Sequence, residues 1–424
     1  MRSIILYTVI ALLHSCAGQG LQKEPDYSNM SVSLKDTVYA YQVSPEVGKE
    51  NLKNLLQSYP GLKEWEERKK CLQEGLLKAM ELFPLPEKTP LNTLFTACTD
   101  LGVYSVENVA FECIPGVWVT GNLYRPSNVK GTIPAVLLAH GHFGNQSDLD
   151  NCPRFLSEHQ CLAASLARMG AVVFAWDMFA YGESAYHAGT AAHKSGLSQT
   201  LQIWSAIRSI DFLLTLPYVD ATRIAMTGAS GGGTQTFLTA AVDDRIAVSA
   251  PAIQVSCFFP GGCACESGRP IHNQCIPPSN NVEIAALAAP RPQLLISDGN
   301  DWTRTLPEVE YPHIRTIYGY YGKKDKVENA HFPNEGHDYG YNKRSAAYRF
   351  LASHLNLNLT VLYRDSSGDS GSIGNSGGSG NEAIDESGYT VLTAAQLAVF
   401  PDKHLPESAL HNMEDIYKAF ARLR

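Results

Sequence analysis

The sequence predicts an α/β protein with a mainly parallel central sheet and helices on both of its faces. Short apolar runs alternate with helical patterns between about residue 133 and residue 357. These runs are apolar throughout rather than at every second position, which is typical of strands buried on both faces. With 424 residues, 44% of them hydrophobic, the chain is long enough to bury a large core.

The hydrophobic patterns place the elements of this region. An alternating stretch at 104–126 is expected to form a two-stranded hairpin ahead of it. Strands are expected at 133–141, 171–184 (with its loop), 223–230, 246–253 and 292–301, and helices at 161–170, 197–217, 234–242 and 345–357. Strands that alternate with helices in this way indicate βαβ units and a parallel sheet.

Composition divides the chain into five parts. Residues 1–18 combine Arg2 with an apolar run and small residues, which is typical of an export signal. Cleavage after this segment and lipidation of Cys16 both fit, so we expect a secreted, periplasmic or lipid-anchored protein that contacts a membrane only through such an anchor. The other parts are a helical N-terminal extension at 19–100, the α/β domain at 101–357, a Gly/Ser-rich linker or loop at 358–388, and a segment at 389–424 that docks back.

Charge and cysteine content narrow the classes of partner and ligand. The net charge of −8 and the lack of basic clusters argue against nucleic acid as a partner. Ten cysteines in an exported chain make disulfides expected, although removal of Cys16 leaves an odd number. A loop disulfide is favoured over free thiols, and a metal site is favoured least, for the four clustered cysteines Cys257, Cys263, Cys265 and Cys275.

A candidate nucleophile lies where a strand is followed by a helix. The segment Gly228-Ala229-Ser230-Gly231-Gly232 matches G-x-S-x-G in that context. So tight a turn strains the serine backbone and exposes Ser230 at the helix N-terminus, where free amides favour a developing negative charge. The alternatives are a capping turn and a phosphate-binding loop, but the P-loop lysine is missing and G-x-G-x-x-G is not matched.

A serine hydroxyl needs a general base. His337 follows Gly336 on a loop before the closing helix, where an imidazole can reach over the turn. His331 is the weaker candidate because it lies before Phe332 and farther from that helix.

The base in turn needs an orienting acid, which follows the nucleophile in chain order and precedes the histidine. Asp301 stands a few residues into the loop after the strand at 292–301 and is the favoured acid. Asp298 is expected to brace the turn at Gly299 instead. Glu266, after the preceding strand, is the third candidate.

An oxyanion hole requires two N–H donors. The amide of Gly231, directly after the nucleophile, is one, and the amide of His142 in the loop after the strand at 133–141 is the other. A metal role for His140 and His142 lacks a third ligand nearby, so the sequence predicts no metal and no other cofactor.

Five segments together resemble a known family, the exported α/β-hydrolases of the acetyl xylan esterase type, which are carbohydrate-associated esterases. The segments are "HGHFG", "AWDMFAYGES", "GASGGGTQT", "AAPRPQLLISDGNDWT" and "ENAHFPNEGHDYG", and the resemblance covers roughly residues 100 to 357. It implies the α/β-hydrolase fold, with Ser230 as nucleophile, His337 as base and Asp301 as its partner. It also suggests that Asp177 and residues 182–184 shape the pocket rim, or alternatively support their own loop.

The resemblance implies a serine carboxylic-ester hydrolase that deacetylates an acylated carbohydrate, either a small molecule or a polysaccharide such as acetyl xylan, without a cofactor. A glucuronoyl esterase, with Glu266 as the acid, and an oligopeptidase-like hydrolase are the alternative enzymes. About eighty helical residues cannot form the β-propeller usual in oligopeptidases. The non-enzyme alternative is an inactive hydrolase-fold binding protein. The sequence does not fix the oligomeric state or the acyl group.

Overall fold

The computed structural model describes residues 41–363 and 383–424. The expected export signal at 1–18 and most of the expected linker lie outside the described residues. Within these two ranges, no helix has the length and apolar character that crossing a membrane requires.

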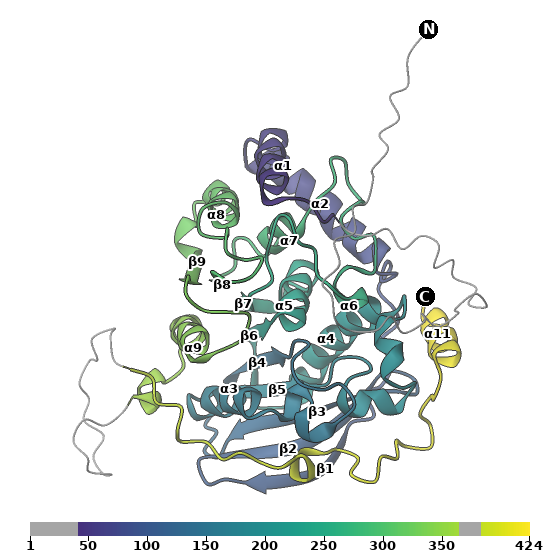
Figure 1. Cartoon of the computed structure of the whole chain (residues 1–424). Helices are drawn as coiled ribbons and strands as arrows, with labels where there is room; N and C mark the ends of the chain where they lie inside the picture. The colour runs from purple at the N-terminus through teal and green to yellow at the C-terminus, as the bar shows by residue number, and fades with distance from the viewer. Residues whose placement is uncertain (1–40, 364–382) are drawn as a thin grey trace. The chain divides into compact units, whose positions relative to one another are not determined.

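Nine strands form one sheet in the order β1-β2-β3-β5-β4-β6-β7-β8-β9 (Figure 1). Strands β4 to β9 run parallel to one another, whereas β1, β2 and β3 are an antiparallel extension joined through β5. The strands are β1 (Leu94–Asp100), β2 (Tyr104–Ile114), β3 (Val117–Pro126), β4 (Ile133–Ala139), β5 (Val172–Trp176), β6 (Val219–Ala229), β7 (Ile246–Ala252), β8 (Gln293–Asp298) and β9 (Val327–Phe332). The expected α/β class with a mainly parallel sheet is confirmed.

Helices cover both faces of this sheet. Helices α3 and α9 pack on one face, and α4 and α5 pack on the other. The α-helices are α1 (Pro45–Ser58), α2 (Leu62–Ala79), α3 (Ser157–Arg168), α4 (Ser198–Thr215), α5 (Gly231–Val242), α6 (Ala264–Ser267), α7 (Asn281–Ala286), α8 (Glu310–Tyr320), α9 (Tyr341–Leu355), α10 (Ala394–Leu397) and α11 (Met413–Ala421). Short 3-10 turns include η5 (Thr190–Lys194).

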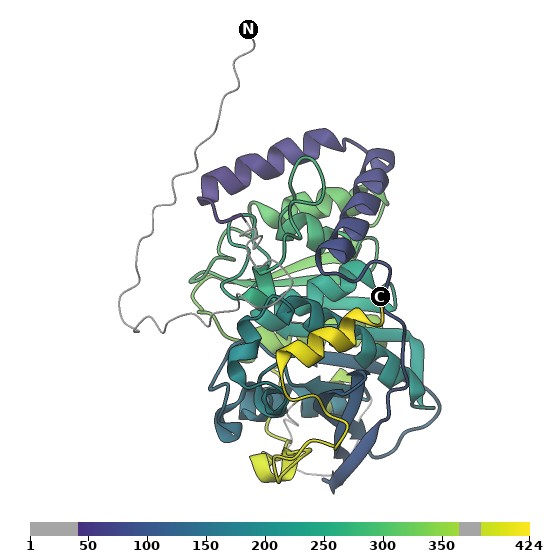
Figure 2. The same ribbon diagram turned by 90° about the vertical axis from the view of Figure 1, so that its right-hand side faces the viewer.

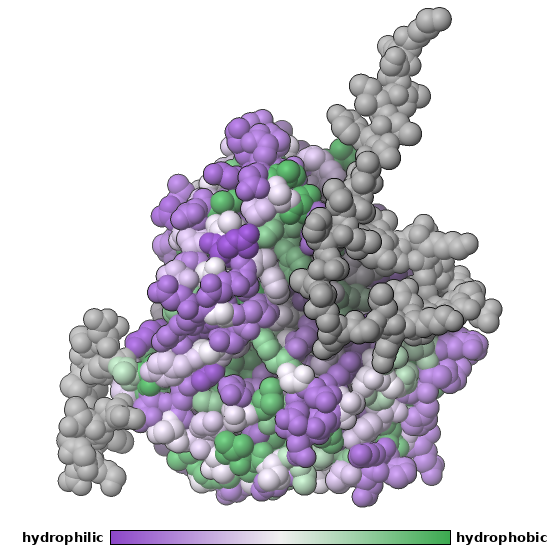
Figure 3. Space-filling model, in the orientation of Figure 1, coloured by the Kyte–Doolittle hydropathy of each residue, from purple (hydrophilic) through white to green (hydrophobic). Residues whose placement is uncertain are grey.

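The uniformly apolar strands contribute side chains to two hydrophobic cores, one on each face of the sheet. In β4, Leu137 belongs to the core under α4 and α5, whereas the next residue, Leu138, belongs to the core under α3 and α9. Both side chains are fully buried, because successive side chains point to opposite faces of a sheet. Figure 3 shows hydrophilic residues over most of the coloured surface of one face, with hydrophobic residues in smaller groups between them.

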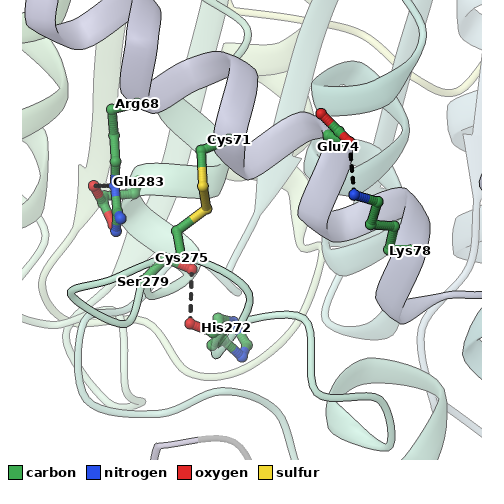
Figure 4. Close-up of a disulfide and its surroundings, with 8 residues drawn as sticks. All are labelled: Arg68, Cys71, Glu74, Lys78, His272, Cys275, Ser279 and Glu283. Atoms are coloured by element: carbon green, nitrogen blue, oxygen red, sulfur yellow. Dashed lines mark hydrogen bonds and ion pairs between the residues drawn. A yellow bond between two sulfur atoms is a disulfide. The ribbon is translucent and has the colours of Figure 1, made fainter.

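Several side-chain links join α2 to the sheet domain, and Figure 4 shows two of them. In α2, Arg68 Nη2 lies 2.8 Å from Glu283 Oε2 of α7, and Cys71 forms a disulfide with Cys275. Figure 2 shows α1 and α2, in purple, together at the upper end of the domain.

Two expectations for these regions are wrong. The disulfide was expected among the four clustered cysteines, but Cys275 pairs with Cys71, which lies 204 residues away in the sequence. In addition, residues 94–100 lie in the range expected to be helical, and they form strand β1.

Residues 392–400 lie against the antiparallel part of the sheet. Asn122 Nδ2 of β3 donates to Leu397 O at 2.9 Å, and Asn108 Nδ2 of β2 donates to Ala398 O at 2.9 Å. Val399 and Phe400 join a small buried cluster with residues of β2 and β3. The last helix, α11, follows and appears in yellow across the domain in Figure 2.

Candidate active site

The G-x-S-x-G segment forms a strained turn between β6 and α5. β6 ends at Ala229, α5 begins at Gly231, and Ser230 between them has φ 57° and ψ −122°. A positive φ in a non-glycine residue costs on the order of 1–3 kcal/mol and persists only where the surroundings enforce it. Here Ser230 N donates to Ala252 O at 3.0 Å, and Ser230 O accepts from Thr234 N at 3.0 Å. The turn is therefore held by β7 on one side and by α5 on the other.

The glycines of the motif permit this close approach of backbone segments. A Cβ on Gly228 would lie 2.3 Å from Ala139 O, and a Cβ on Gly232 would lie 2.2 Å from the same atom. A Cβ on Gly233 would lie 2.6 Å from Ala252 O. Any side chain at these positions would push α5 away from the ends of β4 and β7.

The candidate base and acid are in direct contact. His337 Nδ1 lies 2.6 Å from Asp301 Oδ2. The Asp301 side chain is 3% exposed and that of His337 is 27% exposed, so the acid is enclosed while the imidazole reaches the surface. The second oxygen of Asp301 accepts from the backbone N of Thr303 at 2.5 Å and from its hydroxyl at 2.6 Å, which fixes the carboxylate. The indole of Trp302 packs on His337 with ring centroids 4.4 Å apart.

The competing aspartate has a separate structural partner. Asp298 Oδ1 accepts from Asn300 N at 3.1 Å, as expected for a residue that braces this turn. Its Oδ2 lies 3.4 Å from Nζ of the buried Lys343. Burial, followed by the negative charge of Asp301, raises the pKa of Asp298.

The alternative acid, Glu266, and the alternative base, His331, also have other partners. Glu266 Oε2 accepts from Gly262 N at 2.9 Å and from Cys263 N at 3.1 Å, and burial raises the pKa of this carboxyl. His331 Nδ1, on β9, lies 2.9 Å from Ser297 Oγ of the neighbouring β8.

The loop after β4 lies against the Ser230 turn, where the two oxyanion donors were expected. A Cβ on Gly141 would lie 2.9 Å from Ser230 Cβ, and the His142 ring lies 2.7 Å from a Cβ built on Gly231. Gly231 is the first residue of α5, so its N–H has no acceptor within the helix. The structure thus brings Gly141 and the ring of His142 to the turn that contains Gly231.

His140 is used to shape this loop. Its Nε2 accepts from Met178 N at 2.9 Å, just after β5, and its Nδ1 lies 2.9 Å from Gly141 O. Burial lowers the pKa of His140 to about 4, so its ring is neutral at neutral pH. Both ring nitrogens therefore contact backbone groups.

Comparison with known proteins places this geometry in a family. Residues 81–264 match the family model described as acetyl xylan esterase (AXE1). A solved structure named Methylesterase BT1017 is 33% identical, with a TM-score of 0.79, over 91% of this chain and 82% of that chain. The chain belongs to the acetyl xylan esterase family of carbohydrate esterases. It is a carboxylic-ester hydrolase with the α/β-hydrolase fold.

More distant relatives agree with this fold. A glucuronoyl esterase from Solibacter usitatus is 15% identical, with a TM-score of 0.51, over 69% of this chain and 94% of that chain. The protein YtaP of Bacillus subtilis (strain 168), a hydrolase by its name, is 25% identical over 39% of this chain. The matched region spans 58% of the length of that curated relative.

In this esterase, Asp177 and the 182–184 turn surround a buried arginine. Arg154 Nε lies 2.8 Å from Asp177 Oδ1, and Arg154 Nη2 lies 2.6 Å from Glu183 Oε2, with all three side chains fully buried. Glu183 also accepts from the backbone N of Val399 at 3.0 Å and of Phe400 at 2.6 Å. These contacts agree with support of the loop rather than with a pocket rim.

A cluster of four metal-ligating side chains lies beside the esterase site, and sequence reasoning missed it. The ligand atoms of His142, His193, Cys263 and Cys265 all lie within 4.8 Å of one another. The sequence showed three of these residues in two separate segments, but His193 lies on η5 with no motif around it. Only the fold brings the three segments together.

Proposed function

We propose that Ser230, His337 and Asp301 form the catalytic triad of this esterase and that its substrate is an acetylated carbohydrate. The 2.6 Å contact between His337 and Asp301, together with the strained Ser230 turn, is the observation that carries the proposal. The Asp301 carboxylate accepts a hydrogen bond from His337 Nδ1. This leaves the lone pair of the neutral imidazole on Nε2, the nitrogen that acts as base in such triads.

Hydrolysis then follows two steps. Ser230 Oγ attacks the ester carbonyl while His337 Nε2 takes its proton, and the amides of Gly231 and His142 hold the oxyanion. The ester bond breaks as His337 returns the proton to the departing sugar oxygen, which leaves an acetyl-enzyme. Water attacks this intermediate with His337 as base, and the bond from Ser230 Oγ to the acetyl group breaks as His337 returns the proton to Oγ, which releases acetate.

A second substrate class, a methyl ester of a carbohydrate, is favoured by a specific observation. The similarity to Methylesterase BT1017 spans 91% of this chain, whereas the acetyl xylan esterase model matches residues 81–264 alone. A methyl ester on a carbohydrate requires a sugar carboxyl group, so the sugar would be the acyl part and methanol the leaving group. The same residues would perform the same two steps, with the sugar attached to Ser230.

One experiment separates these substrates and tests the triad. Wild type is assayed on p-nitrophenyl acetate, acetylated xylan and methyl-esterified polygalacturonate, with acetate and methanol measured. Ser230→Ala and His337→Ala are each expected to lose on the order of 10⁴-fold or more in kcat, while His331→Ala keeps most of the activity. Acetate from xylan supports the deacetylase, and methanol as the main product supports the methylesterase. Full activity in Ser230→Ala would remove the triad proposal.

We also propose that the chain is exported, and that Cys16 is the attachment point if the mature protein carries a lipid. The disulfide between Cys71 and Cys275 supports an oxidising compartment. Cell fractionation of full-length wild type and of Cys16→Ser tests both points. If Cys16 carries a lipid, the wild type is found in the membrane fraction and Cys16→Ser is not. Recovery of the wild type in the cytoplasm would contradict export.

A further inference from the structure

We propose that His142, His193, Cys263 and Cys265 bind a zinc ion in a closed structural site beside the active-site turn. His142 Nε2 lies 3.1 Å from His193 Nε2 and 3.1 Å from Cys265 Sγ. In a tetrahedral zinc site, the zinc–nitrogen and zinc–sulfur bond lengths place neighbouring ligand atoms about 3.3–3.8 Å apart. All four ligand atoms lie within 4.8 Å of one another, so changes on the order of 1 Å in these distances would let them surround one ion.

His193 is oriented as a metal-binding histidine. Its Nδ1 lies 2.7 Å from the carbonyl oxygen of Phe179, and a carbonyl can only accept a hydrogen bond. The proton of the neutral ring is therefore on Nδ1, and the Nε2 lone pair points to His142 and the cysteines. A hydrogen bond from the second nitrogen to a backbone carbonyl is the usual way in which proteins fix a ligating imidazole.

The loop that carries both cysteines is equally fixed. Cys263 caps α6, and the carboxylate of Glu266 accepts from the backbone N–H groups of Gly262 and Cys263. Cys265 and His193 are buried, while His142 and Cys263 are half-buried. Four protein ligands with this degree of enclosure match a structural site, which leaves no open position for a substrate.

The donor set selects the kind of cation. Two thiol groups and two imidazoles suit zinc, whereas calcium and magnesium require oxygen ligands. Binding as thiolates would also keep Cys263 and Cys265 reduced in a protein that has a disulfide elsewhere. The alternative to a bound zinc ion is a disulfide bond between Cys263 and Cys265.

The site connects three segments, and the one that carries His142 lies against the catalytic turn. His142 follows β4, His193 lies on η5, and the two cysteines flank the start of α6. The ring of His142 packs on Gly231, and its backbone N–H is the second oxyanion donor of the proposed function. If that function is right, the ion positions this amide through the His142 ring.

Metal analysis of the folded protein tests the site without any assay of activity. The full chain is produced with supplementary zinc, purified without a metal-affinity tag, and measured by inductively coupled plasma mass spectrometry. We expect about one zinc per chain in wild type and in the control Cys98→Ser, which removes an exposed lone cysteine. Cys263→Ser, Cys265→Ser and His193→Ala should each hold at least about five-fold less.

Two further measurements keep the test decisive if a variant is unstable. Cobalt substitution of the wild type should give a sulfur-to-cobalt charge-transfer band that Cys263→Ser, the half-buried and least disruptive change, weakens. Mass spectrometry of trapped thiols should find Cys263 and Cys265 reduced. Wild type with far less than one zinc and a Cys263–Cys265 disulfide would overturn the proposal, as would zinc retained in all three variants.

The catalytic consequence is tested separately. Removal of the ion with a strong chelator is expected to lower kcat for ester hydrolysis at least about ten-fold, with recovery on addition of zinc. If the protein binds zinc but cleaves no ester, the proposed function is refuted and the proposed metal site stands. If the protein is an active esterase that binds no zinc, the proposed metal site is refuted and the proposed function stands.

Discussion

At the scale of single residues, the site depends on two aspartates three positions apart. Asp298 is the last residue of β8 and Asp301 lies in the loop that follows, and their oxygens have different partners. Asp301 holds His337 with one oxygen and Thr303 with the other, whereas Asp298 braces the turn and faces Lys343. Because Thr303 Oγ1 also accepts from Asp298 N at 3.1 Å, the geometry of the acid loop is fixed before a substrate binds.

Asp301→Asn is expected to lower kcat on the order of 10⁴-fold, because an amide at this position favours the wrong tautomer of His337. Asp298→Asn is the matched control. It keeps an oxygen for Asn300 N and is expected to stay within about ten-fold of wild type. Kinetics on p-nitrophenyl acetate check both variants. Equal losses in the two would show that the assignment of the acid is wrong.

At the scale of elements, the sequence predicted the strands of the buried sheet centre and missed those at its edges. β4 and β5 are buried along almost their whole length, so their apolar runs identified them. β1 is largely exposed and β9 is half-buried, and each pairs with a strand on one side only. An edge strand does not need an apolar pattern on both faces, so nothing in the composition of 94–100 or 327–332 marked it.

Glu183 connects the 392–400 segment to the body of the domain. Its carboxylate is fully buried, pairs with Arg154 and accepts from the backbone of Val399 and Phe400. Glu183→Gln leaves Arg154 with one fewer buried counter-charge, and such a loss costs about 3–5 kcal/mol. We expect lower stability in urea and faster hydrogen exchange at residues 392–400. Exchange there equal to that of wild type would contradict this role.

At the scale of the whole molecule, the candidate site shows what order along the chain can and cannot reveal. Ser230 and Asp301 were predicted because each stands at the end of an expected strand, and the ends of parallel strands meet at one edge of the sheet. His337 was predicted from its place on the loop before the closing helix. His193 was not, because η5 is neither a strand end nor part of a motif. For the same reason, the sequence did not indicate that Cys275 pairs with Cys71, because Cys71 lies in a helix of the N-terminal region.

This long-range disulfide is expected to stabilise the fold mainly through the unfolded chain. The bond closes a loop between residues 204 positions apart, for which the chain-entropy model gives about 5 kcal/mol and measured losses are about 2–5 kcal/mol. Cys71→Ser should therefore lower the free energy of unfolding in this range under non-reducing conditions. Cys98→Ser, at an exposed free thiol, should not. If reduction of the wild type left its urea midpoint unchanged, the bond would not be a stabilising element.

Buried neutral histidines give the whole fold a dependence on pH. Burial lowers the pKa of His272 to about 4 and that of His313 to about 3. His272 Nε2 donates to Asn281 Oδ1 at 2.8 Å, and its Nδ1 is buried without a hydrogen-bond partner, so a second proton would have no acceptor. In the unfolded chain both rings take up a proton near pH 6.5.

Between pH 6.5 and about 4, the unfolded state therefore binds more protons than the folded state, and stability falls as the solution is acidified. His272 alone accounts for at most about 3 kcal/mol of this loss. His272→Gln keeps the donor to Asn281 and removes the titration, so its free energy of unfolding should fall less steeply over this range. His404→Gln, at an exposed position, should follow the wild type. Urea unfolding at pH 7.5, 5.5 and 4.5 gives the change in the free energy of unfolding with pH for each of the three proteins. An equal change in all three would show that His272 is protonated in the folded state.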